Sequence, residues 1–117
     1  MKLEQLEMYK LAMQIGEKIW NCIVVNDYFS RQTLGLQVVR SADSIAANIS
    51  EGEGVYYFKA KRKFLYYARG SVYETITWLN KMKERKLIKE AAFMDIDEQL
   101  EELRRLINGN IKKIPIS

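Results

Sequence analysis

Histidine is absent from this sequence of 117 residues, and cysteine and proline each occur once. Without histidine the chain lacks the commonest general base, and with a single cysteine it also lacks most ligands of transition-metal sites. Cys22 has no partner for an internal disulfide, and Pro115 lies too near the end to interrupt a helix. We therefore expect no metal ion and no other cofactor.

Long apolar runs are also missing. No stretch of about 18 apolar residues is present, so we expect no membrane span, and the opening letters MKLEQLEMYK lack the apolar core of a signal peptide. Together with the lone cysteine, this favours a reducing, cytoplasmic location. The composition, 48% hydrophobic and 29% charged, is that of a globular protein. A chain of this length predicts one domain over residues 1–117.

Apolar residues recur at helical spacing in four segments, whereas the alternating runs of Val, Ile and Thr that indicate strands are missing. The segments cover about residues 4–25, 31–52, 58–85 and 95–111. Ser30 is a plausible N-cap for the second helix, and Asp95 or Asp97 for the start of the fourth, while the tail 109–117 is expected to fray. Short connections favour antiparallel neighbours. The sequence therefore predicts an all-α fold, an antiparallel up-and-down four-helix bundle.

Residues 41–54, SADSIAANISEGEG, combine small side chains with a helical apolar period. We expect the small residues to keep the second helix thin, so that the third approaches it closely through Gly70 and Ser71, just as Gly16 thins the first. Asn48 lies on the seam and would fix the register of the helices through a polar partner such as Glu51 or Glu74. Gly52 and Gly54 are expected to provide the C-cap and turn.

Two chemical interpretations of this stretch fit poorly. In a phosphate-binding P-loop the glycines precede a lysine and open a helix, but here they follow the apolar period. A catalytic Ser44 or Ser50 with Glu51 would need a base to activate the hydroxyl, and the chain has no histidine. We therefore expect no enzymatic activity.

Two motifs in this region resemble a known family. SIAANISEGEG, preceded by Arg40, and FLYYARGSVYE, nine residues further on, closely resemble the four-helix-bundle family of 23S ribosomal RNA intervening-sequence proteins, which includes the accessory variability proteins of diversity-generating retroelements. The opening LEMYKLAMQIGEKIW and the close EELRRLINGNIKKI extend the resemblance over nearly the whole chain. The matching positions are Arg40, Ser44, Ile45, Ala47, Asn48, Ile49, Glu51, Gly52, Gly54, Phe64, Leu65, Ala68, Gly70, Ser71 and Glu74.

The resemblance implies an up-and-down bundle that assembles as a ring-shaped homopentamer. It also implies a basic surface, which in the retroelement branch engages nucleic acid and a reverse transcriptase. One stretch departs from the family pattern: VYYFKAKRK carries Val55, Tyr56 and Tyr57 where a basic residue and a helix-capping Ser or Thr are common. Lys61 stands where an aromatic residue is frequent.

Charge is distributed unevenly along the chain. Residues 58–89 hold ten Lys or Arg against two Glu, whereas residues 90–102 hold six acidic residues and no basic one. The basic stretch, with tyrosines interleaved, offers phosphate neutralisation and surfaces for base stacking. For any single residue the commoner explanation is structural: the lysines form a solvated helix face that answers the acidic fourth helix, and the tyrosines are used in packing. The candidate contacts to nucleic acid are Lys59, Lys61, Arg62, Lys63, Arg69, Lys81, Lys83, Arg85 and Lys86.

Two functions follow from these patterns. The first is a non-enzymatic, oligomeric scaffold or chaperone that binds RNA or DNA through the phosphate backbone with little base readout. The alternative is a protein-interaction module whose basic face docks an acidic partner without nucleic acid. Repetition of a basic patch by ring symmetry would strengthen attraction to a polyanion, which favours the first.

Overall fold

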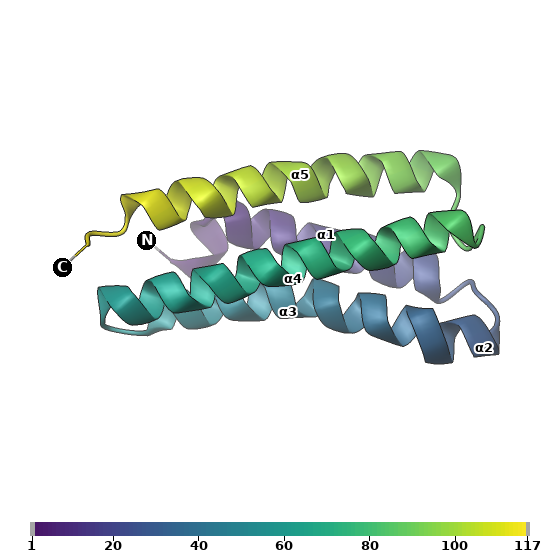
Figure 1. Ribbon diagram of the computed structural model, residues 1–117, viewed down its shortest axis with the longest axis horizontal. Helices are drawn as coiled ribbons and strands as arrows, with labels where there is room; N and C mark the ends of the chain where they lie inside the picture. The colour runs from purple at the N-terminus through teal and green to yellow at the C-terminus, as the bar shows by residue number, and fades with distance from the viewer. Residues whose placement is uncertain (1, 117) are drawn as a thin grey trace.

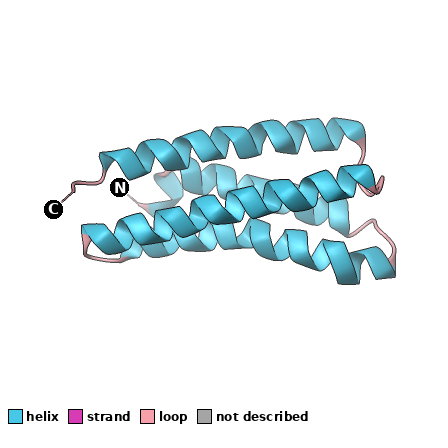
Figure 2. Cartoon of the chain, viewed as in Figure 1, coloured by secondary structure: helices cyan, strands magenta, loops and turns pink. Residues whose placement is uncertain are grey.

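The computed structural model describes residues 2–116, which form helices and no strand (Figure 2). A 3-10 turn, Leu3–Gln5, precedes the first long helix. The α-helices are α1 (Glu7–Ile23), α2 (Tyr28–Ser30), α3 (Leu36–Gly54), α4 (Phe58–Glu84) and α5 (Glu90–Lys113). A π-helical segment, Arg31–Gly35, joins α2 to α3 without a break. The predicted all-α class is confirmed.

The four long helices run up and down along a bundle whose Cα atoms span 48 × 23 × 22 Å (Figure 1). Each long helix packs against two neighbours in the cyclic order α1, α3, α4, α5, and the contact between α3 and α4 is the most extensive. The start of α4 lies at the same end of the bundle as both chain termini. The predicted antiparallel four-helix bundle is therefore confirmed. Within residues 2–116, no helix has the length and hydropathy needed to cross a bilayer.

The core contains most of the apolar lines that helical spacing predicts. Its fully buried large side chains come from all four long helices: Ile15, Ile19, Val38, Ile45, Ile49, Val72, Leu79, Met82, Ile96, Leu100, Leu103 and Ile107. Burial of each such side chain contributes roughly 1.5–3 kcal/mol. Met13 and Trp20 on α1 remain 46% and 52% exposed and form an apolar flank of that helix that the bundle does not cover.

The helix boundaries differ from the prediction at three places. Ser30 is not an N-cap, because the helical path begins at Tyr28 after Asp27, which has extended backbone angles. The last helix begins at Glu90 rather than at Asp95, and it continues to Lys113, so residues 109–113 are not frayed. Ser117, the final residue of the predicted tail, lies outside the described residues. Asx and Ser side chains in mid-helix resemble caps in sequence, and tertiary contacts decide which are used.

Gly52 allows α4 to approach α3 closely and does not form a turn. Every described glycine has a negative φ, including Gly52 and Gly54. A Cβ on Gly52 would lie 3.3 Å from Cβ of Phe64 on α4, which is tighter than most such contacts. The expectation that Gly52 supplies a flexible C-cap is therefore wrong, and its value is the missing side chain.

Candidate nucleic-acid interface

Small and hydroxyl side chains join α3 to α4 where the two helices approach most closely. Ser44 Oγ and Ser71 Oγ lie 2.6 Å apart, and Thr75 Oγ1 donates to Ser41 Oγ at 2.9 Å. Asn48 Nδ2 donates to the backbone oxygen and Oγ of Ser44, so its predicted partners among the glutamates are wrong. The expected close contact of thin surfaces is present, and a hydroxyl ladder satisfies its polar groups.

Gly70 takes no part in that contact. It is exposed, and a Cβ built on it would meet nothing within 4 Å, although Ser71 beside it faces α3. An α-helix turns by about 100° per residue, so Gly70 and Ser71 point in different directions and only one of them faces α3. The prediction that Gly70 mediates the close crossing is therefore wrong for the isolated chain.

Gly16 does lie against a neighbouring helix, as expected. A Cβ there would lie 3.1 Å from Oδ1 of Asp43 on α3, in a groove between α1 and α3. Partial burial raises the pKa of the Asp43 carboxyl above its ordinary value, and the nearby charge of Glu17 raises it further. This groove therefore gathers negative charge, which makes it a poor site for a phosphate.

The motif residues divide into buried and outward-facing sets. The buried set consists of Ile45, Ile49, Gly52, Leu65 and Ala68. The exposed set consists of Arg40, Ala47, Glu51, Gly54, Gly70 and Glu74. Glu74 accepts a hydrogen bond from Nε1 of Trp78 on the same helix. The buried members account for the packing of α3 on α4, while the exposed members are available to a ligand or a second copy.

Eight of the nine candidate basic residues fall into two clusters at opposite ends of α4, and Arg69 lies between the clusters. The N-terminal basic cluster consists of Lys59, Lys61, Arg62 and Lys63. The C-terminal basic cluster consists of Lys81, Lys83, Arg85 and Lys86. Twenty helical residues separate Lys63 from Lys83, which is about 30 Å along the axis. The sequence placed these residues in one stretch, but the helix keeps them apart, so they do not form a single patch.

The C-terminal basic cluster has a structural explanation. Lys81 and Lys83 lie in the last turn of α4, where cations are favoured by the negative end of the helix dipole. Lys86 has a left-handed φ of 58° and closes the helix: its N–H donates to Lys83 O, and that of Leu87 donates to Met82 O. These two bonds form a Schellman motif. Lys83 also lies over the ring of Phe93, 4.6 Å from its centroid.

The N-terminal basic cluster is placed against the helix dipole. The first turn of α4 contains no acidic residue, and Lys59 lies at the positive end, where a cation is unfavourable. Lys59 and Lys63 are also one helical turn apart, a like-charge spacing that destabilises a helix. Both side chains are exposed. Helix stability therefore does not explain these two lysines.

Two members of this cluster hold parts of the fold. Lys61 Nζ donates to the backbone oxygens of Gly52 and Glu53 and so caps the C-terminus of α3. Arg62 Nη1 donates to the backbone oxygen of Pro115 in the C-terminal tail. Further along α4, Arg69 Nη1 donates to Asn108 Oδ1 at 2.9 Å. Within the N-terminal basic cluster, Lys61 and Arg62 therefore bond to backbone oxygens, whereas Lys59 and Lys63 do not; Lys63 Nζ lies 5.1 Å from the centroid of the neighbouring Phe64 ring.

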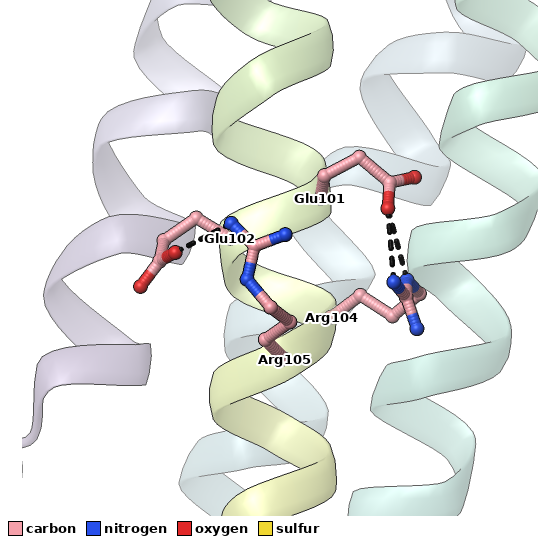
Figure 3. Close-up of polar contacts among 4 residues, drawn as sticks. All are labelled: Glu101, Glu102, Arg104 and Arg105. Carbon is pink, nitrogen blue, oxygen red and sulfur yellow. Dashed lines mark hydrogen bonds and ion pairs between the residues drawn. The ribbon is translucent and has the colours of Figure 1, made fainter.

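The acidic helix does not neutralise α4. Glu101 pairs with Arg104 and Glu102 with Arg105, all on α5, at 3.1 and 2.7 Å (Figure 3). The hydrogen bond and charge of Glu101 raise the pKa of Arg104. Asp95 pairs with Lys18 of α1 at 2.7 Å. Over residues 2–116, no ion pair joins α4 to a carboxylate, so the expected neutralisation of α4 by the acidic helix is absent within this chain.

Two kinds of side chain bear on catalysis: those that could bind a metal ion and those that could act as a nucleophile. Within the part of the chain that the structure describes, no three His, Cys, Asp or Glu side chains are placed to hold a metal ion. Cys22 is half-buried, and burial raises the pKa of its thiol, so little thiolate is present at neutral pH.

Residues 4–109 match the family of 23S rRNA-intervening sequence proteins. The chain belongs to this family. A solved member of the S23 ribosomal protein family, a protein of unknown function from Bacteroides thetaiotaomicron, has a similar structure with a TM-score of 0.81. It is 22% identical, and the match covers 91% of this chain and 99% of the other. No curated protein matches the chain.

The tyrosines at the N-terminal end of α4 lie on the surface of the bundle. Tyr56 and Tyr57 are 86% and 72% exposed, and Tyr66 and Tyr67 are 46% and 54% exposed. The expectation that these tyrosines pack in the bundle is therefore wrong for the isolated chain. Helical spacing from the buried residues Leu65 and Ala68 already places Tyr66 and Tyr67 away from the core, whereas Tyr56 and Tyr57 precede the helix.

Proposed function

We propose that the protein is a non-enzymatic scaffold that binds RNA or DNA through phosphate contacts made by the N-terminal basic cluster. The observation that carries this proposal is the position of Lys59 and Lys63. They crowd the positive end of a helix dipole, repel each other, and have no carboxylate partner over residues 2–116. A polyanionic ligand would turn each of these unfavourable features into an attraction.

Family membership supports a role near RNA, but it does not specify one. The exposed members of the motif and the open apolar flank of α1 support the further proposal that copies of the chain assemble, as a homopentamer in the form that the resemblance implies. A ring would carry one N-terminal basic cluster per subunit, and the electrostatic potentials of these clusters would add to attract a polyanion. Light scattering on the purified protein tests this part, and a monomer at micromolar concentration would rule out the ring.

Salt dependence tests the phosphate contacts. We expect affinity for mixed-sequence RNA and DNA to fall steeply as salt rises, because bound phosphates release counterions. The double variant Lys59→Gln/Lys63→Gln should reduce the slope of log affinity against log salt by roughly one to two per chain. Both side chains are exposed and neither caps a helix, so the fold should be unaffected.

The matched control uses the other end of the same helix. Lys81→Gln/Arg85→Gln removes the same charge from the C-terminal basic cluster, about 30 Å away. We expect this variant to retain most of the salt slope. Equal losses in the two variants would mean that net charge alone is sensed. Absence of binding at low salt would reject the proposal and leave docking of an acidic protein partner as the function of the basic face.

A further inference from the structure

A groove on the outer face of α4 combines aromatic side chains with members of the N-terminal basic cluster. It is lined by Tyr57, Lys59, Ala60, Arg62, Lys63, Tyr66 and Tyr67. A second depression continues from it around Tyr56, Tyr57 and Phe58. The groove is thus aromatic and cationic at once, and it contains no carboxylate.

The tyrosines of this groove do not serve the core of the bundle. Tyr57 is 72% exposed at the N-cap of α4, and its ring meets the ring of Tyr56 edge to face at 5.1 Å. Tyr66 and Tyr67 stand two turns further along, about half exposed. The guanidinium of Arg69 lies 4.9 Å from the centroid of Tyr66 and steadies that ring. Exposed aromatic groups gathered in this way mark a binding surface.

We propose that this groove binds single-stranded nucleic acid, with unpaired bases stacking on Tyr57, Tyr66 and Tyr67. The inference rests on the proposed function and adds the class of nucleic acid. Single-strand sites combine a basic track for the backbone with aromatic rings on which successive bases stack. Lys59 and Lys63 supply the track here, and the tyrosines supply the rings.

The spacing of the groove fits a short strand. Tyr57 and Tyr66 are nine residues apart, which is about 14 Å along the axis of α4. At about 3.4 Å per nucleotide of a stacked strand, this span holds about four nucleotides. Lys59 and Lys63 lie between the two rings in sequence, so the phosphates of the same nucleotides fall within reach of both cations.

A nucleic-acid duplex cannot stack its bases on the tyrosine rings of this groove. In a duplex the faces of the bases are stacked on each other, and only their edges and the phosphates are presented to a protein. The tyrosine rings would then contribute little, while the lysines would still attract the phosphates. The groove therefore predicts that single strands bind more tightly than duplexes of the same sequence, by about tenfold or more if one ring stacks fully.

The test compares a 5′-labelled 20-nucleotide strand of mixed sequence with the same strand annealed to its complement, by fluorescence anisotropy at fixed salt. RNA and DNA versions are both used. We expect the single strand to bind at least tenfold more tightly. In Tyr66→Leu/Tyr67→Leu this preference should fall several-fold, because only Tyr57 of the three rings remains, with duplex affinity unchanged. Tyr66→Phe/Tyr67→Phe keeps both rings and should retain the preference.

A matched control lies at the other end of the bundle. Tyr28 and Phe29 of α2 are 70% and 72% exposed, so Tyr28→Leu/Phe29→Leu removes two aromatic rings that are more accessible to a ligand than Tyr66 and Tyr67. This variant should bind as the wild type does. Light scattering on each variant shows whether the tyrosines instead form contacts between copies of the chain.

Each result decides one point. Equal affinity for single strand and duplex, unchanged by the leucine variant, overturns the inference and leaves the proposed phosphate scaffold intact. Absence of binding to either probe at low salt overturns both. A leucine variant that changes the number of subunits also overturns the inference, because the rings would then be covered by a second copy.

Discussion

Ser44 Oγ lies 2.6 Å from Ser71 Oγ where α3 crosses α4, while Gly70, the next residue along α4, has nothing within 4 Å of the position its Cβ would take. Ser71 thus makes a tight contact with α3, whereas Gly70, the residue before it, faces open space. The two positions make a matched pair, because each carries a small residue on the same helix and only one faces α3.

At the tight position, Ser71→Leu should destabilise the protein by about 1–3 kcal/mol. A leucine there has to displace Ser44 or bend the crossing of α3 and α4, and overpacking of close helix contacts typically has this effect. Urea unfolding followed by circular dichroism measures the change. A variant as stable as the wild type would show that the crossing relaxes easily.

At the open position, Gly70→Ala should stabilise the protein by up to about 1 kcal/mol. Glycine in a helix interior is less favourable than alanine by roughly that amount, and the structure shows no atom that the added methyl group would meet. The same urea experiment applies. Loss of stability would indicate that a second copy of the chain packs on Gly70, and subunit mass by light scattering would check this.

For Gly35, in the π-helical segment, we expect an alanine substitution to lower stability rather than raise it. A Cβ on Gly35 would lie 3.0 Å from Cγ2 of Ile23 and 3.1 Å from the backbone oxygen of Ser30. Gly35→Ala should therefore lower the melting temperature, since the backbone oxygen cannot move aside freely. Gly109→Ala on α5 is the control, because nothing lies within 4 Å of that Cβ. Equal effects of the two alanines would contradict the tight turn at Gly35.

Asp43 gives a prediction for the dependence of stability on pH. Partial burial and the charge of Glu17 raise its pKa in the folded state above the ordinary value of 3.8. The folded state therefore prefers the protonated carboxyl, and the resulting penalty is complete above the raised pKa and lost as pH falls toward 3.8. Asp43→Asn should raise the melting temperature at pH 7.

The advantage of the asparagine should shrink as the pH is lowered, because the wild-type carboxyl then becomes neutral too. Melting temperatures of both proteins between pH 3 and pH 7 provide the measurement. Glu17→Gln is a useful companion, since it removes only the charge contribution. An advantage that stays constant across this range would mean that charge at Asp43 is not the cause.

Much of the fold could be predicted from the sequence, because helical periodicity reports burial directly. Lines such as Ile96, Leu100 and Leu103 are buried where the spacing places them. Helical phase also places Gly70 on the face of α4 opposite Leu65 and Ala68, so its small size alone was a misleading signal for a close crossing. The π-helical turn before α3 gave no recognisable signal in the residues that form it.

The sequence predicted which basic residues belong to the candidate site, but not how the fold distributes them. Charge counting along residues 58–89 found the cations, yet the length of α4 divides them between two ends. Lys61 and Arg62 were indistinguishable from Lys59 in sequence, because their backbone partners in α3 and the C-terminal tail are set by the fold.

The affinity of Lys59→Glu for mixed-sequence RNA at low salt, measured together with its stability, tests the central claim most directly. A glutamate at this position favours the helix dipole and pairs with Lys63 one turn later, so the variant should be more stable by about 0.3–1 kcal/mol. If the N-terminal basic cluster holds phosphates, the same variant should bind RNA several-fold more weakly. A more stable variant with unchanged affinity would contradict the assignment of this cluster to nucleic acid.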